Sequence, residues 1–135
     1  MSNIDVVNKI YAAFAAGNIP AVLELFDPAI EWFSAENSPL ADRSPYRGLN
    51  QVVEGVLTRI GLEFPGLVIQ VDELLDAGDK IVMLGRYHGV RKATGRGFHA
   101  QVAHIWTIIG GKATKFQQYL DTYQVAQTAT SGQSA

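Results

Sequence analysis

The sequence predicts an α+β domain in which N-terminal helices pack on the concave face of a curved antiparallel β-sheet. In the first half of the 135-residue chain, apolar residues recur at helical spacing, whereas in the second half they alternate with polar residues as in strands. Between two strand-like runs stands Gly110-Gly111, a pair that supplies the positive φ angles of a tight hairpin turn. A sheet that curls around helices leaves a cavity between the two layers.

The N-terminal half predicts three helices. Residues 3–16 carry apolar side chains at spacings of three and four, which indicates an amphipathic helix that ends at Gly17. Pro20 starts a second, short helix, because proline at the first helical position loses no hydrogen bond. Asn50 is the expected N-cap of a third helix, which ends at Gly61.

Strands and turns account for most of the remaining chain. A short strand is predicted for residues 29–34, and residues 35–48 have the Pro, Ser, Asp and Gly content of a loop. Loops of this length are typically lids or disordered. Four consecutive antiparallel strands are predicted from Leu67 onward, separated by turns at residues 77–79, 91–97 and the Gly-Gly pair.

Composition bounds the function. The prediction is one domain, residues 1–125, followed by a small, polar, disordered tail, residues 126–135. The absence of cysteine excludes thiol catalysis, disulfides and cysteine-ligated zinc. With a net charge of −2, the protein has no overall positive potential to attract nucleic acid or an anionic membrane. The N-terminus lacks a signal-peptide pattern. We expect a cytoplasmic protein with no nucleic-acid or membrane partner.

The hairpin register predicts a pocket wall. Continuing the pairing of Ile109 with Lys112 puts one set of side chains on a single face: Val102, His104, Trp106, Gln117, Tyr119 and Asp121. This mixture of apolar, aromatic and ionisable groups suits a pocket better than a dry core. The outer face, with Ile105 and Phe116, needs cover, which predicts a homodimer through that face.

Four runs together resemble a SnoaL-like member of the NTF2-like superfamily over nearly the whole chain. These runs are YAAFAAGNIPAVLELFDPAIEW, PYRGLNQVVEGVL, GDKIVMLGRYHG and ATGRGFHAQVAHIWTIIGGKATKFQQYLDTY. The resemblance implies an NTF2-like (cystatin-like) α+β cone that usually dimerises through the outer sheet face. The superfamily includes ketosteroid isomerases, polyketide cyclases, limonene-type epoxide hydrolases and non-catalytic binding domains, so the fold implies no single activity.

The resemblance is closer at some of the superfamily's functional positions than at others. Tyr119-Leu120-Asp121 is similar to the position where polyketide cyclases and limonene-type epoxide hydrolases keep a catalytic aspartate. The Arg-x-Asp pair of those hydrolases is matched by Arg86-Tyr87-His88, with histidine in place of the second carboxylate. The ketosteroid isomerases place their base aspartate on the first strand, where this chain reads Ile30-Glu31-Trp32-Phe33. Tyr11 lies one position from the helix tyrosine of the isomerases.

These residues support two hypotheses. In the first, the protein is a cofactor-independent isomerase, cyclase or epoxide-hydrolase-like enzyme acting on a mostly apolar carbonyl or epoxide substrate. Its catalytic candidates are Asp121, as acid or base, and His104. Its substrate-binding candidates are Trp32, Trp106, Tyr119, Tyr11, Arg86, His88 and Tyr46. In the second, it is a non-catalytic ligand-binding or accessory domain.

Each candidate also has a purely structural interpretation. Asp121 could be a solvated strand-end carboxylate, and His104 a hydrogen-bonded core group.

No metal and no cofactor are predicted, because the three histidines lack a tight ligand spacing and His99 and His104 should point to opposite faces of the sheet.

Overall fold

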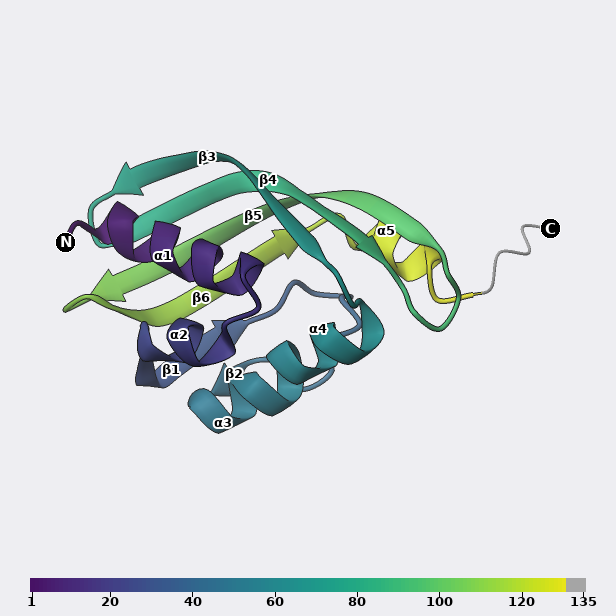
Figure 1. Ribbon diagram of the computed structural model, residues 1–135, viewed down its shortest axis with the longest axis horizontal. Helices are drawn as coiled ribbons and strands as arrows, with labels where there is room; N and C mark the ends of the chain where they lie inside the picture. Colours follow the sequence, from purple (N-terminus) through teal and green to yellow (C-terminus); the bar gives the residue numbers. More distant parts are fainter. Residues whose placement is uncertain (131–135) are drawn as a thin grey trace.

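Six strands form one curved sheet in the order β2-β1-β6-β5-β4-β3, and helices line its concave side (Figure 1). This is a computed structural model, and it describes residues 1–130. The helical elements are α1 (Asn3–Ala15), α2 (Ile19–Glu24), α3 (Leu49–Val52), the π-helical turn η1 (Val53–Leu57), α4 (Thr58–Glu63) and α5 (Thr122–Gln127). The strands are β1 (Phe26–Phe33), β2 (Tyr46–Arg47), β3 (Val68–Ala77), β4 (Lys80–Val90), β5 (Gly97–Ile109) and β6 (Lys112–Leu120). The predicted α+β fold is confirmed.

Helix α1 forms as its sequence predicts. Ser2 caps the first turn and exchanges hydrogen bonds with Asp5 in a capping box. The apolar stripe of the helix, which includes Val7, Ile10 and Tyr11, is buried against the sheet. Tyr11 thereby reaches the space between helix and sheet.

The third predicted helix is longer than expected. The helical segment runs from Leu49 to Glu63. It continues past Gly61, so the predicted helix end at Gly61 is wrong. Glycine weakens a helix without breaking it, and the Phe64 N–H still bonds to the Ile60 carbonyl at 2.8 Å. A π-helical turn interrupts this segment where Gly55 lies against the Tyr46 ring.

A β-bulge corrects the predicted hairpin register. Gly110 and Gly111 do form the turn, with φ of 59° and 78°, and Ile109 does pair with Lys112. Thr114, however, is an extra residue in β6, so His104 pairs with Gln118 rather than Gln117. A one-residue shift exchanges the two faces of a strand.

The exchange changes which side chains point inward. Beyond the bulge, Phe116, Gln118 and Leu120 lie on the concave side, whereas Gln117 and Tyr119 lie on the outer side. The predicted outer position of Phe116 is therefore wrong, and its side chain is only 1% exposed.

Strand β1 differs from the prediction in length and direction. It begins at Phe26, includes Asp27-Pro28, and pairs with β6 in parallel, while the other pairs are antiparallel. The short strand β2 lies within the predicted loop 35–48 and pairs with β1. The loop is therefore fixed at its C-terminal end to the sheet.

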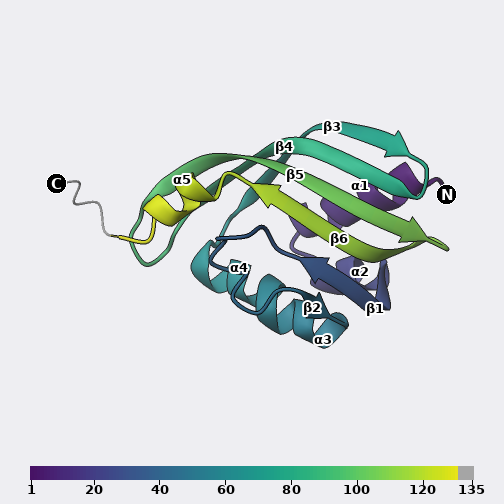
Figure 2. The same ribbon diagram turned by 180° about the vertical axis from the view of Figure 1, so that it is seen from behind.

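A helix that the sequence did not predict covers the far end of the sheet. Helix α5 follows β6 and lies at the end of the molecule opposite the N-terminus (Figure 2). Just after it, Thr128 is buried and accepts a hydrogen bond from Arg91 Nε at 3.0 Å. The predicted tail, residues 126–135, therefore begins within α5, and residues 131–135 lie outside the described residues.

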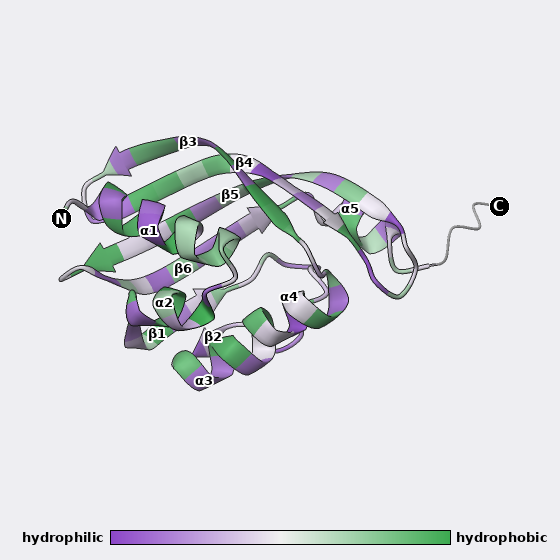
Figure 3. Ribbon diagram, in the orientation of Figure 1, coloured by the Kyte–Doolittle hydropathy of each residue, from purple (hydrophilic) through white to green (hydrophobic). Residues whose placement is uncertain are grey.

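Hydrophobic and hydrophilic residues are interspersed along the strands (Figure 3), and some of the apolar ones are exposed on the outer face of the sheet. Leu75 and Leu84 are 42% and 39% exposed, and Tyr119 is 57% exposed. The homodimer through this face stays a prediction.

None of the helices within residues 1–130 combines the length and the apolar character needed to cross a bilayer.

Candidate functional site

A cavity lies between the concave face of the sheet and the helices. Its lining is mostly apolar and comes from α1, α2, β1, the loop after β1, η1, α4, strands β3 to β6 and α5. The space open to the centres of water molecules is about 80 Å³. Such a space holds several water molecules, so it can admit a small organic molecule. No Asp, Glu, Lys or Arg of the described chain lines it.

Five side chains form a continuous hydrogen-bonded series at this cavity, which we call the polar chain. Trp106 Nε1 donates to the Tyr11 hydroxyl at 2.8 Å, and that hydroxyl lies 2.7 Å from His104 Nδ1. On the other side of the imidazole, the Tyr87 hydroxyl lies 2.5 Å from His104 Nε2, and Gln118 Nε2 donates to Tyr87 at 2.9 Å. The polar chain joins α1, β4, β5 and β6.

The polar chain is neutral at neutral pH. His104 is 2% exposed, and burial lowers the pKa of its imidazole to about 3. Burial also raises the pKa of the Tyr11 and Tyr87 hydroxyls well above the usual value for tyrosine. His104, predicted as a catalytic group, is thus placed at the cavity with both ring nitrogens already bonded.

Gln118 has a fixed orientation. The backbone N–H of Ala35 donates to Gln118 Oε1 at 3.1 Å, so the amide nitrogen faces Tyr87. Gln118 reaches this position only because the bulge at Thr114 turns it inward. The amide therefore ties the loop after β1 to the polar chain.

Trp32 brings an unsatisfied donor to the same region. Its side chain lines the cavity, is 7% exposed, and stacks on Phe116 with ring centroids 3.8 Å apart. Its indole Nε1 is buried and has no hydrogen-bond partner. A buried donor without an acceptor is costly, which is typical of a position that a ligand or water completes.

Asp121 lies outside the cavity lining. It is the N-cap of α5, and its carboxylate accepts hydrogen bonds from the Gln124 backbone N–H at 3.4 Å and side-chain Nε2 at 3.0 Å. Strand β6 ends at Leu120, one residue earlier, and in the shifted register the Asp121 backbone N–H donates to the Gln101 carbonyl at 3.0 Å. The catalytic role of Asp121 stays a prediction.

The other candidates divide into two groups. Tyr11, Trp32 and Trp106 line the cavity, and their contacts with a substrate stay predictions. Four others do not line it: Tyr119, Arg86, His88 and Tyr46. Their contacts with a substrate stay predictions.

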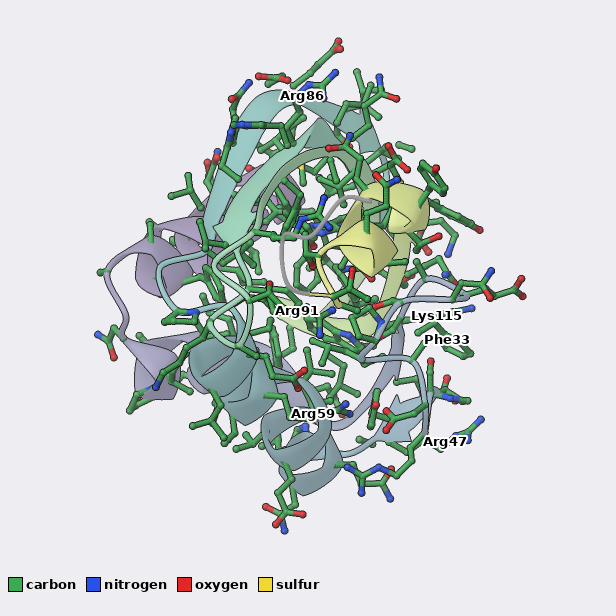
Figure 4. All side chains as sticks on the ribbon, turned by 90° about the vertical axis from the view of Figure 1, so that its right-hand side faces the viewer. Phe33, Arg47, Arg59, Arg86, Arg91 and Lys115 are labelled. Carbon is green, nitrogen blue, oxygen red and sulfur yellow. The ribbon has the colours of Figure 1, made fainter. Side chains whose placement is uncertain are left out.

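Three of these four belong to the outer side of the sheet. Tyr119 faces outward because of the bulge. Arg86 lies on the outside of the sheet (Figure 4) and donates to the His99 carbonyl at 2.9 Å. His88 Nδ1 lies 2.7 Å from His99 Nδ1, and His88 Nε2 lies 2.6 Å from Gln70 Oε1. As predicted, His99 and His104 lie on opposite faces.

Tyr46 supports the loop that closes the cavity. Its hydroxyl donates to the Leu40 carbonyl at 2.6 Å. From α4, Arg59 donates to Asp42 at 2.7 Å and to the Pro39 carbonyl at 3.0 Å (Figure 4). Because Pro39 and Leu40 line the cavity, these contacts hold one of its walls.

Sequence reasoning did not identify Tyr87 and Gln118. Tyr87 shares the inward parity of Ile81 and Met83 on β4, and that alternation is a signal that could have found it. For Gln118 no such signal exists, because its direction depends on the bulge.

Within the described residues, no group of three or more His, Asp or Glu side chains is arranged to hold a metal ion.

Comparisons with known proteins agree with this architecture. A family model described as a SnoaL-like domain matches residues 7–116. The chain is similar to an NTF2-like protein from Burkholderia thailandensis, with 35% identity, a TM-score of 0.90, and coverage of 96% of this chain and 98% of that chain. It is also similar to an NTF2-like protein of unknown function from Burkholderia pseudomallei, with 25% identity, a TM-score of 0.87, and coverage of 97% and 100%.

A more distant likeness concerns the fold alone. A protein with a ketosteroid isomerase-like fold from Catenulispora acidiphila, in complex with trimethylamine, is 19% identical, with a TM-score of 0.78 and coverage of 96% of this chain and 94% of that chain. A search among curated proteins finds no match.

Proposed function

The chain belongs to the family of SnoaL-like domains, and from this premise we propose that it binds a small, mostly apolar molecule in the cavity beneath the sheet. The observation that carries the proposal is the cavity itself: an apolar lining interrupted by one buried, neutral polar chain. Pockets of this composition bind small molecules through apolar contact and use a few polar groups for orientation. A carbonyl- or epoxide-bearing ligand suits these surroundings because it is apolar except for one oxygen.

Filling the cavity is expected to weaken binding. Ile60 and Leu62 both belong to α4, but Ile60 lines the cavity whereas Leu62 is 65% exposed. We expect Ile60→Trp to weaken binding of indane, a small apolar probe, by at least about ten-fold, or roughly 1.4 kcal/mol. Leu62→Trp, the matched control, should bind as the wild type does. Isothermal titration measures both, and circular dichroism checks that each variant is folded.

Two results would contradict the proposal. The first is that the wild type does not bind indane or any comparable apolar probe. The second is that Ile60→Trp and Leu62→Trp bind equally well, which would place the ligand outside this cavity.

A second candidate function is a cofactor-independent isomerase or cyclase. It is favoured by the position of His104 and two tyrosine hydroxyls at the cavity, because such groups can donate hydrogen bonds to an enolate oxygen. In this candidate Asp121 supplies the acid or base. Its carboxylate now caps α5, whose Val125 lines the cavity, so a movement of α5 would have to bring it to the ligand.

Two variants distinguish the role of Asp121 as a helix cap from its role as an acid or base. As an N-cap, asparagine replaces aspartate well, whereas Asp121→Ala should lower the free energy of unfolding by about 1 kcal/mol. Neither asparagine nor alanine can act as an acid or a base at this position. We therefore expect Asp121→Asn to keep wild-type stability in urea unfolding and, in this second candidate, to lose catalysed deuterium exchange at C2 of 1-indanone. Exchange at the wild-type rate in Asp121→Asn would remove Asp121 from the mechanism.

A further inference from the structure

The polar chain holds one more hydrogen than its bonds use. Trp106 Nε1–H, two tyrosine O–H groups, one imidazole N–H and the Gln118 N–H directed at Tyr87 make five hydrogens. Only four hydrogen bonds join these five side chains. Each bond uses one hydrogen, so one hydrogen is left over whatever the arrangement.

The left-over hydrogen belongs to a tyrosine. Trp106 can only donate, and the Ala35 contact fixes Gln118 as a donor, so both ends of the chain point their hydrogens at tyrosine oxygens. If His104 carries its proton on Nδ1, it donates to Tyr11, and the Tyr11 O–H is free. If the proton is on Nε2, His104 donates to Tyr87, and the Tyr87 O–H is free.

The tautomer of His104 therefore decides at which of two points of the cavity the free hydrogen lies. The two tautomers keep the same contacts between heavy atoms, because only the direction of two hydrogen bonds reverses. Tyr11 and Tyr87 both line the cavity, Tyr11 from α1 and Tyr87 from β4.

From this count we propose that the cavity recognises an acceptor oxygen of the neutral carbonyl class through one movable phenolic hydrogen, carried by Tyr11 or Tyr87 according to the tautomer of His104. The inference rests on the proposed function, since it names the ligand chemistry of the same cavity. An ammonium or carboxylate ligand is disfavoured, because no described charged side chain in the lining would compensate its charge.

Trp32 supports the same ligand chemistry independently. Its buried indole N–H also lacks an acceptor, so the cavity wall offers a second hydrogen without a partner. A ligand that brings lone pairs would satisfy donors that the protein leaves open.

Three probes with the same bicyclic body test the ligand class on the wild-type protein. Indane has no polar group, 1-indanone adds a carbonyl oxygen, and 1-aminoindane adds an ammonium group at neutral pH. We expect 1-indanone to bind about five-fold more tightly than indane, as one net neutral hydrogen bond allows, and 1-aminoindane to bind more weakly than indane.

Nitrogen-15 NMR of the His104 ring tests the movable hydrogen. In Tyr11→Phe, bound 1-indanone can take a phenolic hydrogen only from Tyr87, which requires the Nε2–H tautomer. In Tyr87→Phe it can take one only from Tyr11, which requires the Nδ1–H tautomer. We expect opposite tautomers in the two ligand-bound variants. The tighter binding of 1-indanone than of indane should persist in each single variant, because one tyrosine with a free hydrogen remains, and should decrease in Tyr11→Phe/Tyr87→Phe, a pattern that a merely structural role of the tyrosines would not produce. Tyr119→Phe, which removes an exposed hydroxyl outside the cavity, should give the wild-type spectrum.

The outcomes separate this inference from the proposed function. If indane binds but 1-indanone binds no more tightly, or if both variants show the same tautomer, the movable hydrogen is wrong while the apolar cavity remains the binding site. If neither indane nor 1-indanone binds, the proposed function fails, and the inference fails with it.

Discussion

Lowering the pH from 7 to 4 is expected to cost the wild type about 3 kcal/mol more unfolding free energy than it costs a His104→Gln variant. The folded-state pKa of His104 is lowered to about 3 by burial, whereas an unfolded histidine titrates near 6.5. Between these values the unfolded chain binds a proton that the folded chain does not. Stability linked to His104 is therefore complete above pH 6.5 and is lost progressively as the pH falls toward 3.

Urea unfolding at pH 7, 5.5 and 4 measures this difference. Glutamine keeps a polar side chain of similar reach but does not titrate, so the contribution of His104 should disappear from the pH dependence of the variant. All other ionisable groups are shared by the two proteins and cancel in the comparison. Equal losses of stability in wild type and variant would show that the pKa of His104 is the same in the folded and unfolded states, and the lowering of this pKa by burial would be wrong.

Gly85→Ala is expected to destabilise the protein by about 3 kcal/mol or more. Gly85 pairs with Val71 beside a bulge in β3, and a Cβ atom at this position would lie 1.9 Å from the Gln70 carbonyl oxygen. Backbone cannot yield as a flexible side chain does, so the alanine must push β3 away from β4. The cavity wall formed by Ile69 should then be disturbed as well.

Gly97→Ala is the matched control in another strand. Its Cβ would come no closer than 3.4 Å to the Gly89 carbonyl oxygen, an ordinary contact. We expect its free energy of unfolding to stay within about 1 kcal/mol of the wild type. Similar losses in both variants would mean that strand glycines matter here for flexibility rather than for the close approach of β3 to β4.

Local patterns in the sequence determined the elements of this fold. The helical stripe of residues 3–16 predicted α1, because its apolar side chains have only one surface to pack against. Gly110-Gly111 predicted the hairpin turn because both residues need positive φ. Trp106, Trp32 and His104 were named as candidates from their types and positions and Tyr11 from the family resemblance, and all four line the cavity.

Tertiary structure decided which groups meet. A bulge at Thr114 leaves no mark in the alternation of the sequence, because it inserts one residue into an otherwise regular strand. That single residue sends Gln118 inward and Tyr119 outward, and helix α5 then makes Asp121 a cap. In the polar chain, Trp106 bonds to Tyr11, 95 positions away, so the chain exists only once α1 lies across the sheet. Sequence patterns report the local period of burial, whereas a site depends on the register and packing of segments distant in the chain.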